Sequence, residues 1–272
     1  MFASMGVTIR IASTELSNEM VVFLRSTFGL VILFPWLCKK GLKNLATRRP
    51  AAHILRALSG LAAMYCFFYA IANLQIAEAV LLNYCSPLFI ALIALFWLGE
   101  KVTKLIIAAI IIGFLGICLI LKPGFGSFSY AAWIGLVSAL FAAIAMVAIR
   151  NLASTEPTYR TVFYYSLTAT IVSAIPMIWS WQIPDWNMLL IMALAGLFAT
   201  LGQFLLTYSY SLVPAAQVSP FSYTTVIFAA VYGWLFWSEL PDIYMYIGAV
   251  LVIIAGIMAK QSSSMPQITE PD

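Results

Sequence analysis

Polar side chains recur at helical spacing inside a long apolar segment around residue 200. Thr200, Gln203, Thr207 and Ser211 follow one another at intervals of three or four residues, so a helix places them on one face. Hydroxyl and amide groups within an apolar helix are costly, and they tend to face a bundle interior or a water-filled path. The stripe is therefore interpreted as a wall that contacts a small molecule. Hydrogen bonds to neighbouring helices are the alternative explanation.

A second stripe precedes the first by 138 residues and contains Tyr65, Tyr69 and Asn73. Arg25 is the only arginine well inside an apolar run. It could bind an anionic or zwitterionic substrate, or extend its charge to the membrane surface. The predicted substrate-contacting residues are Arg25, Tyr65, Tyr69, Asn83, Ser86, Gln203, Thr207, Gln217 and Tyr223.

Two prolines interrupt otherwise apolar runs, Pro87 in the first half of the chain and Pro220 in the second. Proline removes a backbone donor and frees a carbonyl one turn back, so a spanning helix tolerates it where another helix or a cavity satisfies that group. We expect both prolines to act as kinks that help gating, with a static packing kink as the alternative.

Several chemistries are disfavoured by what the chain lacks. It has one histidine and four cysteines without CxxC spacing, so a two-histidine metal site or a metal cluster is not expected. No nucleophile elbow, HExxH motif or phosphate-binding loop occurs in the sequence. We therefore expect no catalytic residues, no metal and no cofactor.

The composition indicates an integral membrane protein. Of 272 residues, 63% are hydrophobic and 9% are charged, whereas soluble domains have roughly 45–50% apolar and about 25% charged residues. Period-two alternation is absent from the apolar runs, so an all-α bundle is predicted rather than a barrel. The predicted full-length helices span residues 20–38, 54–74, 77–97, 105–121, 131–149, 161–181, 188–212, 215–237 and 244–259.

The basic residues are distributed unevenly between the two ends of these helices. If residues 1–12 occupy a helix position, the basic residues fall mostly on one side of the membrane, and the other side has only Arg10 and Lys122. The basic residues of the first side are Lys39, Lys40, Lys43, Arg48, Arg49, Arg56, Lys101, Lys104, Arg150, Arg160 and Lys260. The positive-inside rule then places the first side, with the C-terminus, in the cytoplasm. The protein is predicted to be a multi-pass inner-membrane protein whose basic loop contacts anionic lipid headgroups rather than nucleic acid.

An internal repeat organises the chain. A shift of 140 residues aligns "ASMGVTIR" with "AIAMVAIR", and Glu100 aligns with Glu239 after a one-residue slip. Two units of five helices follow, residues 1–123 and 124–260, with a disordered tail at 261–272. An odd number of helices per unit makes the two units inverted in the membrane, as in many secondary transporters.

The segments "AEAVLLNYCSPLFIALIALFWLGEK" and "GFLGICLILKPG" resemble the EamA-type repeats of the drug/metabolite transporter superfamily, and "PAAQVSPFSYTTVIFAAVYGWLFWSELPD" is the counterpart in the second unit. The resemblance implies a ten-helix inner-membrane carrier that moves a small metabolite by alternating access through a cavity between the repeats. An amino acid derivative, a nucleoside-like compound or a vitamin would suit the aromatic pocket.

The segments "RRPAAHILRALSG" and "SELPD" also resemble carriers of S-adenosylmethionine and riboflavin. A drug or metabolite efflux exporter is the alternative function, and a membrane-embedded enzyme is a more distant one. The expected partners are a small-molecule substrate and membrane lipids, and a homodimer is left open.

The first apolar stretch, "FASMGVTIR", is only half as long as a spanning helix. Its counterpart in the second unit begins near Tyr130, which places the expected start of helix 1 about ten residues before Met1. We therefore expect an incomplete first helix, caused by a real truncation or by a start at an internal methionine.

Overall fold

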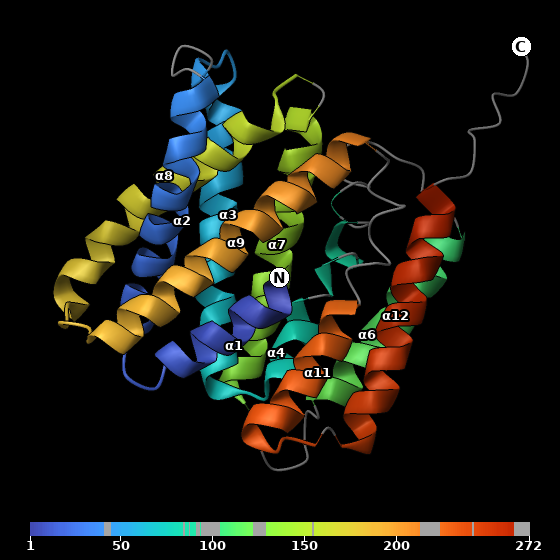
Figure 1. Ribbon diagram of the computed structural model, residues 1–272. Coiled ribbons are helices and arrows are strands. Elements are labelled where there is room, and N and C mark those ends of the chain that lie inside the picture. The colour runs from blue at the N-terminus through green and yellow to red at the C-terminus, as the bar shows by residue number, and fades with distance from the viewer. Residues whose placement is uncertain are drawn as a thin grey trace, which may run out of the picture.

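The computed structural model describes residues 1–40, 45–83, 85–86, 88–90, 93, 104–121, 129–153, 155–212, 224–240 and 242–263. Regular structure in these ranges is helical, which confirms the all-α prediction (Figure 1). The helices are α1 (Phe2–Ala12), α2 (Asn18–Lys40), α3 (Pro50–Asn73), α4 (Ile76–Asn83), α6 (Lys104–Leu121), α7 (Tyr130–Ala153), α8 (Thr158–Met177), the 3₁₀ helix η2 (Ile178–Ser180), α9 (Trp186–Leu212), α11 (Thr224–Trp237) and α12 (Ile243–Ser263).

Five of the described helices are long and apolar enough to cross a membrane. They cover Asn18–Pro35, Pro50–Asn73, Tyr130–Ala153, Thr158–Ser180 and Trp186–Ser209. A segment of about 20 apolar residues is needed to span the hydrocarbon core. The shorter apolar helices include α1 and α11.

Several helix boundaries differ from those predicted, among them those of α3, α8 and α12. α3 begins at Pro50 rather than at residue 54, because proline is favoured in the first turn, where its missing N–H has no partner to lose. α8 ends at Met177, before the one-turn η2. α12 continues to Ser263, so the first three residues of the predicted tail are helical, and the rest of that tail lies outside the described residues.

The helices pack in two neighbouring groups (Figure 1). α3 lies along α7 near the centre, and α12 lies along α6 at one edge of the bundle. α2 packs against α8 and α9, while α1 contacts both α9 and α11. The largest buried apolar cluster among the described residues includes Phe68 and Met192, and a second includes Leu82 and Val252. α1 therefore lies where the two groups meet.

Glycines allow α2 and α9 to approach closely. A Cβ added at Gly196 would lie 2.7 Å from the Cβ of Phe28 and 2.9 Å from the backbone N of Gly29. The Thr200 hydroxyl donates to the Gly29 carbonyl at 3.2 Å across the same contact. Small residues let membrane helices pack backbone against backbone, where dispersion and interhelical hydrogen bonds stabilise the pair.

A single methyl group at this contact should therefore destabilise the fold. Gly196→Ala forces α2 and α9 apart, and overpacking of this kind costs on the order of 2 kcal/mol. The measurement is the apparent melting temperature of the purified protein in detergent. Gly6→Ala is the matched control, because a Cβ there meets side-chain atoms only at 3.8 and 3.9 Å and also improves helix propensity. Equal melting temperatures for the two variants would contradict the packing explanation.

Candidate functional site

The helices line a partly open cavity of about 360 Å³, which lies within the range of roughly 300–1,000 Å³ typical of small-molecule sites. Residues of α1, α2, α3, α4, α7, α8, α9 and α11 line it, so both halves of the chain contribute to its wall. Most of the wall is apolar, formed by residues such as Phe67, Phe68 and Met146. Its polar lining residues are Arg25, Arg56, Asn83, Ser86, Tyr165, Gln203, Ser209 and Thr225.

Four of the predicted substrate-contacting residues line this cavity: Arg25, Asn83, Ser86 and Gln203. Asn83 is held in place by a hydrogen bond of 2.9 Å from its Nδ2 to the Ser138 hydroxyl of α7. α4 and α7 thus present the amide together.

Three other predicted residues lie away from the cavity lining: Tyr65, Tyr69 and Thr207. The hydroxyls of Tyr65 and Thr207 are buried and have no hydrogen-bond partner among the described residues. Gln217, Tyr223, Pro87 and Pro220 lie outside the described residues.

The polar side chains along α9 lie in two different environments, because that helix packs tightly on α2. Thr200 turns toward the Gly29 carbonyl, whereas Gln203 turns toward the cavity and α3. Equal helical spacing therefore does not give these two side chains the same environment.

Arg56 is a cavity residue that the sequence interpretation missed. That interpretation counted it with the basic residues of the cytoplasmic flank, but α3 begins early enough to carry it inside the bundle, and the residue is only 4% exposed. Its Nη2 donates to Oε1 of Gln203 at 2.8 Å, and its guanidinium carbon lies 4.2 Å from the Tyr165 ring centroid. The signal in the sequence was the face shared by Arg56, Gly60 and Ala63, all of which line the cavity.

A cluster of charged residues joins several helix ends at one end of the bundle. Arg10, at the end of α1, forms an ion pair with Glu239 and donates to the Leu74 carbonyl at 2.6 Å. The other carboxylate oxygen of Glu239 accepts the Ile76 backbone N–H at 3.2 Å, and the Arg10 guanidinium carbon lies 5.0 Å from the ring centroid of Trp237. These contacts, called the Arg10 latch below, join the end of α1 and the α3–α4 turn to the α11–α12 loop.

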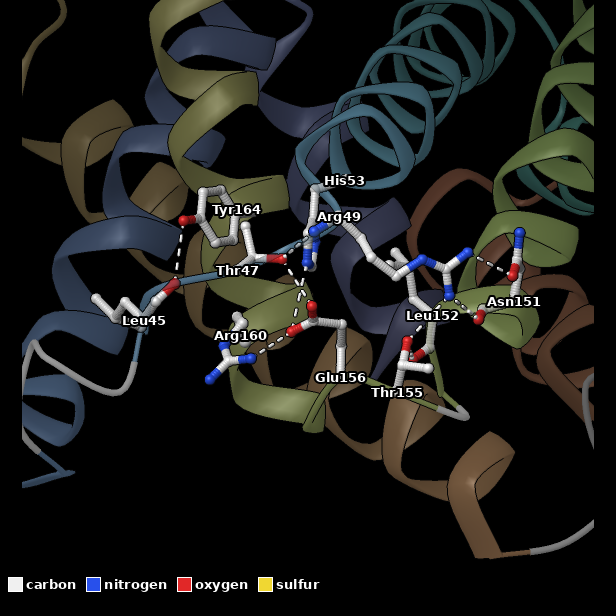
Figure 2. Close-up of polar contacts among 10 residues, drawn as sticks. All are labelled: Leu45, Thr47, Arg49, His53, Asn151, Leu152, Thr155, Glu156, Arg160 and Tyr164. Atoms are coloured by element: carbon white, nitrogen blue, oxygen red, sulfur yellow. Dashed lines mark hydrogen bonds and ion pairs between the residues drawn. The ribbon is translucent and has the colours of Figure 1, made fainter.

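Glu156 organises a second cluster at the opposite end, shown in Figure 2. It lies in the turn between α7 and α8 and is 7% exposed. Its carboxylate accepts hydrogen bonds from Arg160 Nη1 at 2.5 Å and from the Thr47 hydroxyl at 2.6 Å. The Nε2 of His53 lies 3.8 Å from the same carboxylate. These contacts are called the Glu156 latch below.

Arg49 extends the Glu156 latch along α7, as Figure 2 also shows. Its guanidinium donates to the side-chain oxygen of Asn151 at 2.8 Å and to the Thr155 hydroxyl at 2.9 Å. On the other side, the Tyr164 hydroxyl donates to the Leu45 carbonyl at 3.0 Å. The segment before α3 is thereby tied to both α7 and α8.

The hydrogen-bond and charge partners of Glu156 affect its pKa more than its burial does. Burial alone raises the pKa of this carboxyl, but hydrogen bonds from Thr47 and Arg160 and the positive charge of Arg160 lower the pKa below its ordinary value of 4.5. The ionised form is the one that the cluster stabilises.

The contribution of Glu156 to stability should depend on pH. Because its folded-state pKa is lowered, the ionised carboxylate stabilises the fold fully above the ordinary value, and this stabilisation is lost as the pH falls through the folded pKa. Glu156→Gln should cost about 2 kcal/mol at pH 7 and progressively less in acid. Melting temperatures of both proteins between neutral and acidic pH test this. A difference that stays constant with pH would contradict it.

The comparisons with known proteins agree with this architecture. The EamA-like transporter family model matches residues 1–122 and 129–259. The chain belongs to the EamA-like transporter family. This membership confirms the resemblance to the drug/metabolite transporters. The protein is therefore a multi-pass membrane transporter of a small metabolite and not an enzyme.

The relatives of this chain are named for different substrates. A pseudopaline exporter of Pseudomonas aeruginosa is 36% identical over 96% of this chain and 92% of its own length. An S-adenosylmethionine uptake transporter of Rickettsia bellii is 27% identical over 89% and 83%, and a riboflavin transporter of Rhizobium johnstonii is 29% identical over 86% and 79%. A solved crystal structure at 18% identity covers 97% of both chains with a TM-score of 0.66 and supports the fold alone.

Proposed function

We propose that this transporter exports a metabolite of the pseudopaline type across the inner membrane by alternating access. The cavity is the observation that carries the proposal, because both family-matched segments line it and charged latches lie at the two ends of the bundle. The exporter named above supports the outward direction, since its identity of 36% exceeds that of the uptake relative at 27%.

The two matched segments are the inverted units of the carrier in this proposal, residues 1–123 and 124–260, with 261–272 as a tail. The excess of basic residues on one side supports a cytoplasmic C-terminus. Both units of one chain line the cavity, so a homodimer would contain two separate pathways. Gln217 and Tyr223 remain candidate contacts, and Pro87 and Pro220 remain candidate kinks.

Both latches join the first unit to the second, which is what alternating access requires. In one, Arg10 of the first unit holds Glu239 of the second. In the other, Thr47 and Arg49 hold Glu156 and Asn151. Opening one latch while the other stays closed would expose the cavity to one side of the membrane at a time.

Transport in membrane vesicles tests the function and its direction. Inside-out vesicles that contain the full chain should accumulate pseudopaline, whereas right-side-out vesicles should not. S-adenosylmethionine and riboflavin, assayed in parallel, should show less accumulation. Vesicles without the protein provide the background. Accumulation of S-adenosylmethionine or riboflavin but not pseudopaline would contradict the proposal.

Substitution of Gln203 tests whether the cavity is the path. Gln203→Leu keeps the size of the side chain but removes the acceptor that faces Arg56, and we expect at least a tenfold loss of pseudopaline transport at normal membrane levels. Gln182→Leu is the matched control, because Gln182 is exposed between η2 and α9. Unchanged transport by the Gln203 variant would remove this cavity from the pathway.

A further inference from the structure

Two buried arginines face the same tyrosine in the cavity wall. Arg25 of α2 and Arg56 of α3 are each 4% exposed, and both line the cavity. Their guanidinium carbons lie 5.7 and 4.2 Å from the ring centroid of Tyr165. The two positive charges are therefore no farther apart than the sum of these distances.

Neither charge is neutralised within the part of the chain that the structure describes. The ion pairs there join Arg10 to Glu239 and Arg160 to Glu156, with His53 beside the latter carboxylate, and all lie at the ends of the bundle. The Nε atoms of Arg25 and Arg56 are buried without a hydrogen-bond partner.

Neutral neighbours compensate these cations only in part. The face of an aromatic ring attracts a cation, and the attraction is stronger when both are desolvated. The side-chain acceptor for Arg56 is the neutral amide of Gln203. A buried cation without a carboxylate carries a large desolvation penalty, so a ligand that supplies negative charge would be stabilised strongly at this place.

We propose that Arg25 and Arg56 form an anion site that binds the carboxylate groups of the transported metabolite. The proposal rests on the proposed function and names the class of substrate as an organic acid with two carboxylates. Arginine presents planar N–H donors that match a carboxylate in a bidentate geometry. Two guanidinium groups on different helices suit two carboxylates of one ligand, while the apolar wall contacts its carbon skeleton.

Gly60 positions Arg56 for this role. It lies one turn after Arg56 on α3, and a Cβ there would overlap Nη1 of Arg56 and approach Cε2 of Tyr165 to 3.0 Å. An added methyl group would occupy the space that the guanidinium takes beside the ring, so the end of the Arg56 side chain would have to move. Gly60→Ala should therefore displace Arg56 while leaving its charge in the protein.

Ligand-induced thermal stabilisation of the full chain in detergent tests the site. The probes are glutarate, with two carboxylates, and its neutral counterpart glutaramide, at one ionic strength set with sodium chloride. Glutarate should raise the melting temperature of the wild type and glutaramide should not. Arg25→Gln and Arg56→Gln should each weaken the apparent affinity for glutarate at least tenfold.

Three further variants separate a specific site from a general charge effect. Arg48→Gln is the matched control, because Arg48 is exposed and lies outside the cavity, and it should respond to glutarate like the wild type. Arg56→Lys should recover part of the affinity, and Gly60→Ala should lower it. If Arg56→Gln does not fold, the loss of glutarate affinity in Arg25→Gln and Gly60→Ala decides whether the site exists.

The outcomes that overturn the site differ from those that overturn the transport function. Equal stabilisation by glutaramide, no stabilisation of the wild type by glutarate, or full stabilisation of Arg25→Gln and Arg56→Gln overturns the anion site. Carboxylate binding without pseudopaline transport keeps the site and refutes the proposed function. Pseudopaline transport at wild-type rates in both arginine variants refutes the site and keeps the function.

Discussion

The cost of holding charge inside an apolar helical bundle governs this structure. An ion removed from water needs a partner, because its desolvation penalty amounts to several kcal/mol. At the ends of the bundle this requirement is met: Arg10 is paired with Glu239, and Glu156 accepts several donors. In the cavity the described residues meet it with neutral groups, since Arg25 and Arg56 face Tyr165 and an amide. The distribution of partners separates contacts that hold the fold from groups that can receive a ligand.

This distribution also suits a carrier that opens at alternate ends. A latch that opens exchanges its ion pair for hydrogen bonds to water. Because its side chains are mostly buried while it is closed, this exchange is governed by their desolvation as well as by charge, unlike that of an exposed ion pair. The pairs must then be strong enough to close an end and weak enough to release it. Each latch links a segment of the first family-matched half to one of the second. In the proposed alternating-access cycle, relative motion of the halves would therefore make or break each latch as a unit.

Most of the helices could be predicted from the sequence, because a run of about 20 apolar residues has few alternatives in a membrane. The positions of individual polar side chains were harder to predict from the sequence. Arg56 was grouped with the basic flank because a four-residue error in the start of α3 separates a surface arginine from one in the cavity. Thr200 and Gln203 share a helical face by spacing, yet the close approach of α2 at Gly29 directs one of them away from the cavity. Such assignments depend on helix–helix contacts that periodicity does not contain.

The contact between Arg56 and Gln203 connects substrate binding to helix movement in the proposed site. Arg56 belongs to α3 in the first half and Gln203 to α9 in the second, and the hydrogen bond between them crosses the cavity wall. A carboxylate that binds Arg56 competes with the amide for the same donors, and a charged acceptor is the stronger one. Occupancy therefore replaces a bond between the halves with a bond to the ligand. A ligand shifts a conformational equilibrium only through contacts that differ between the two states, and this exchange is such a difference.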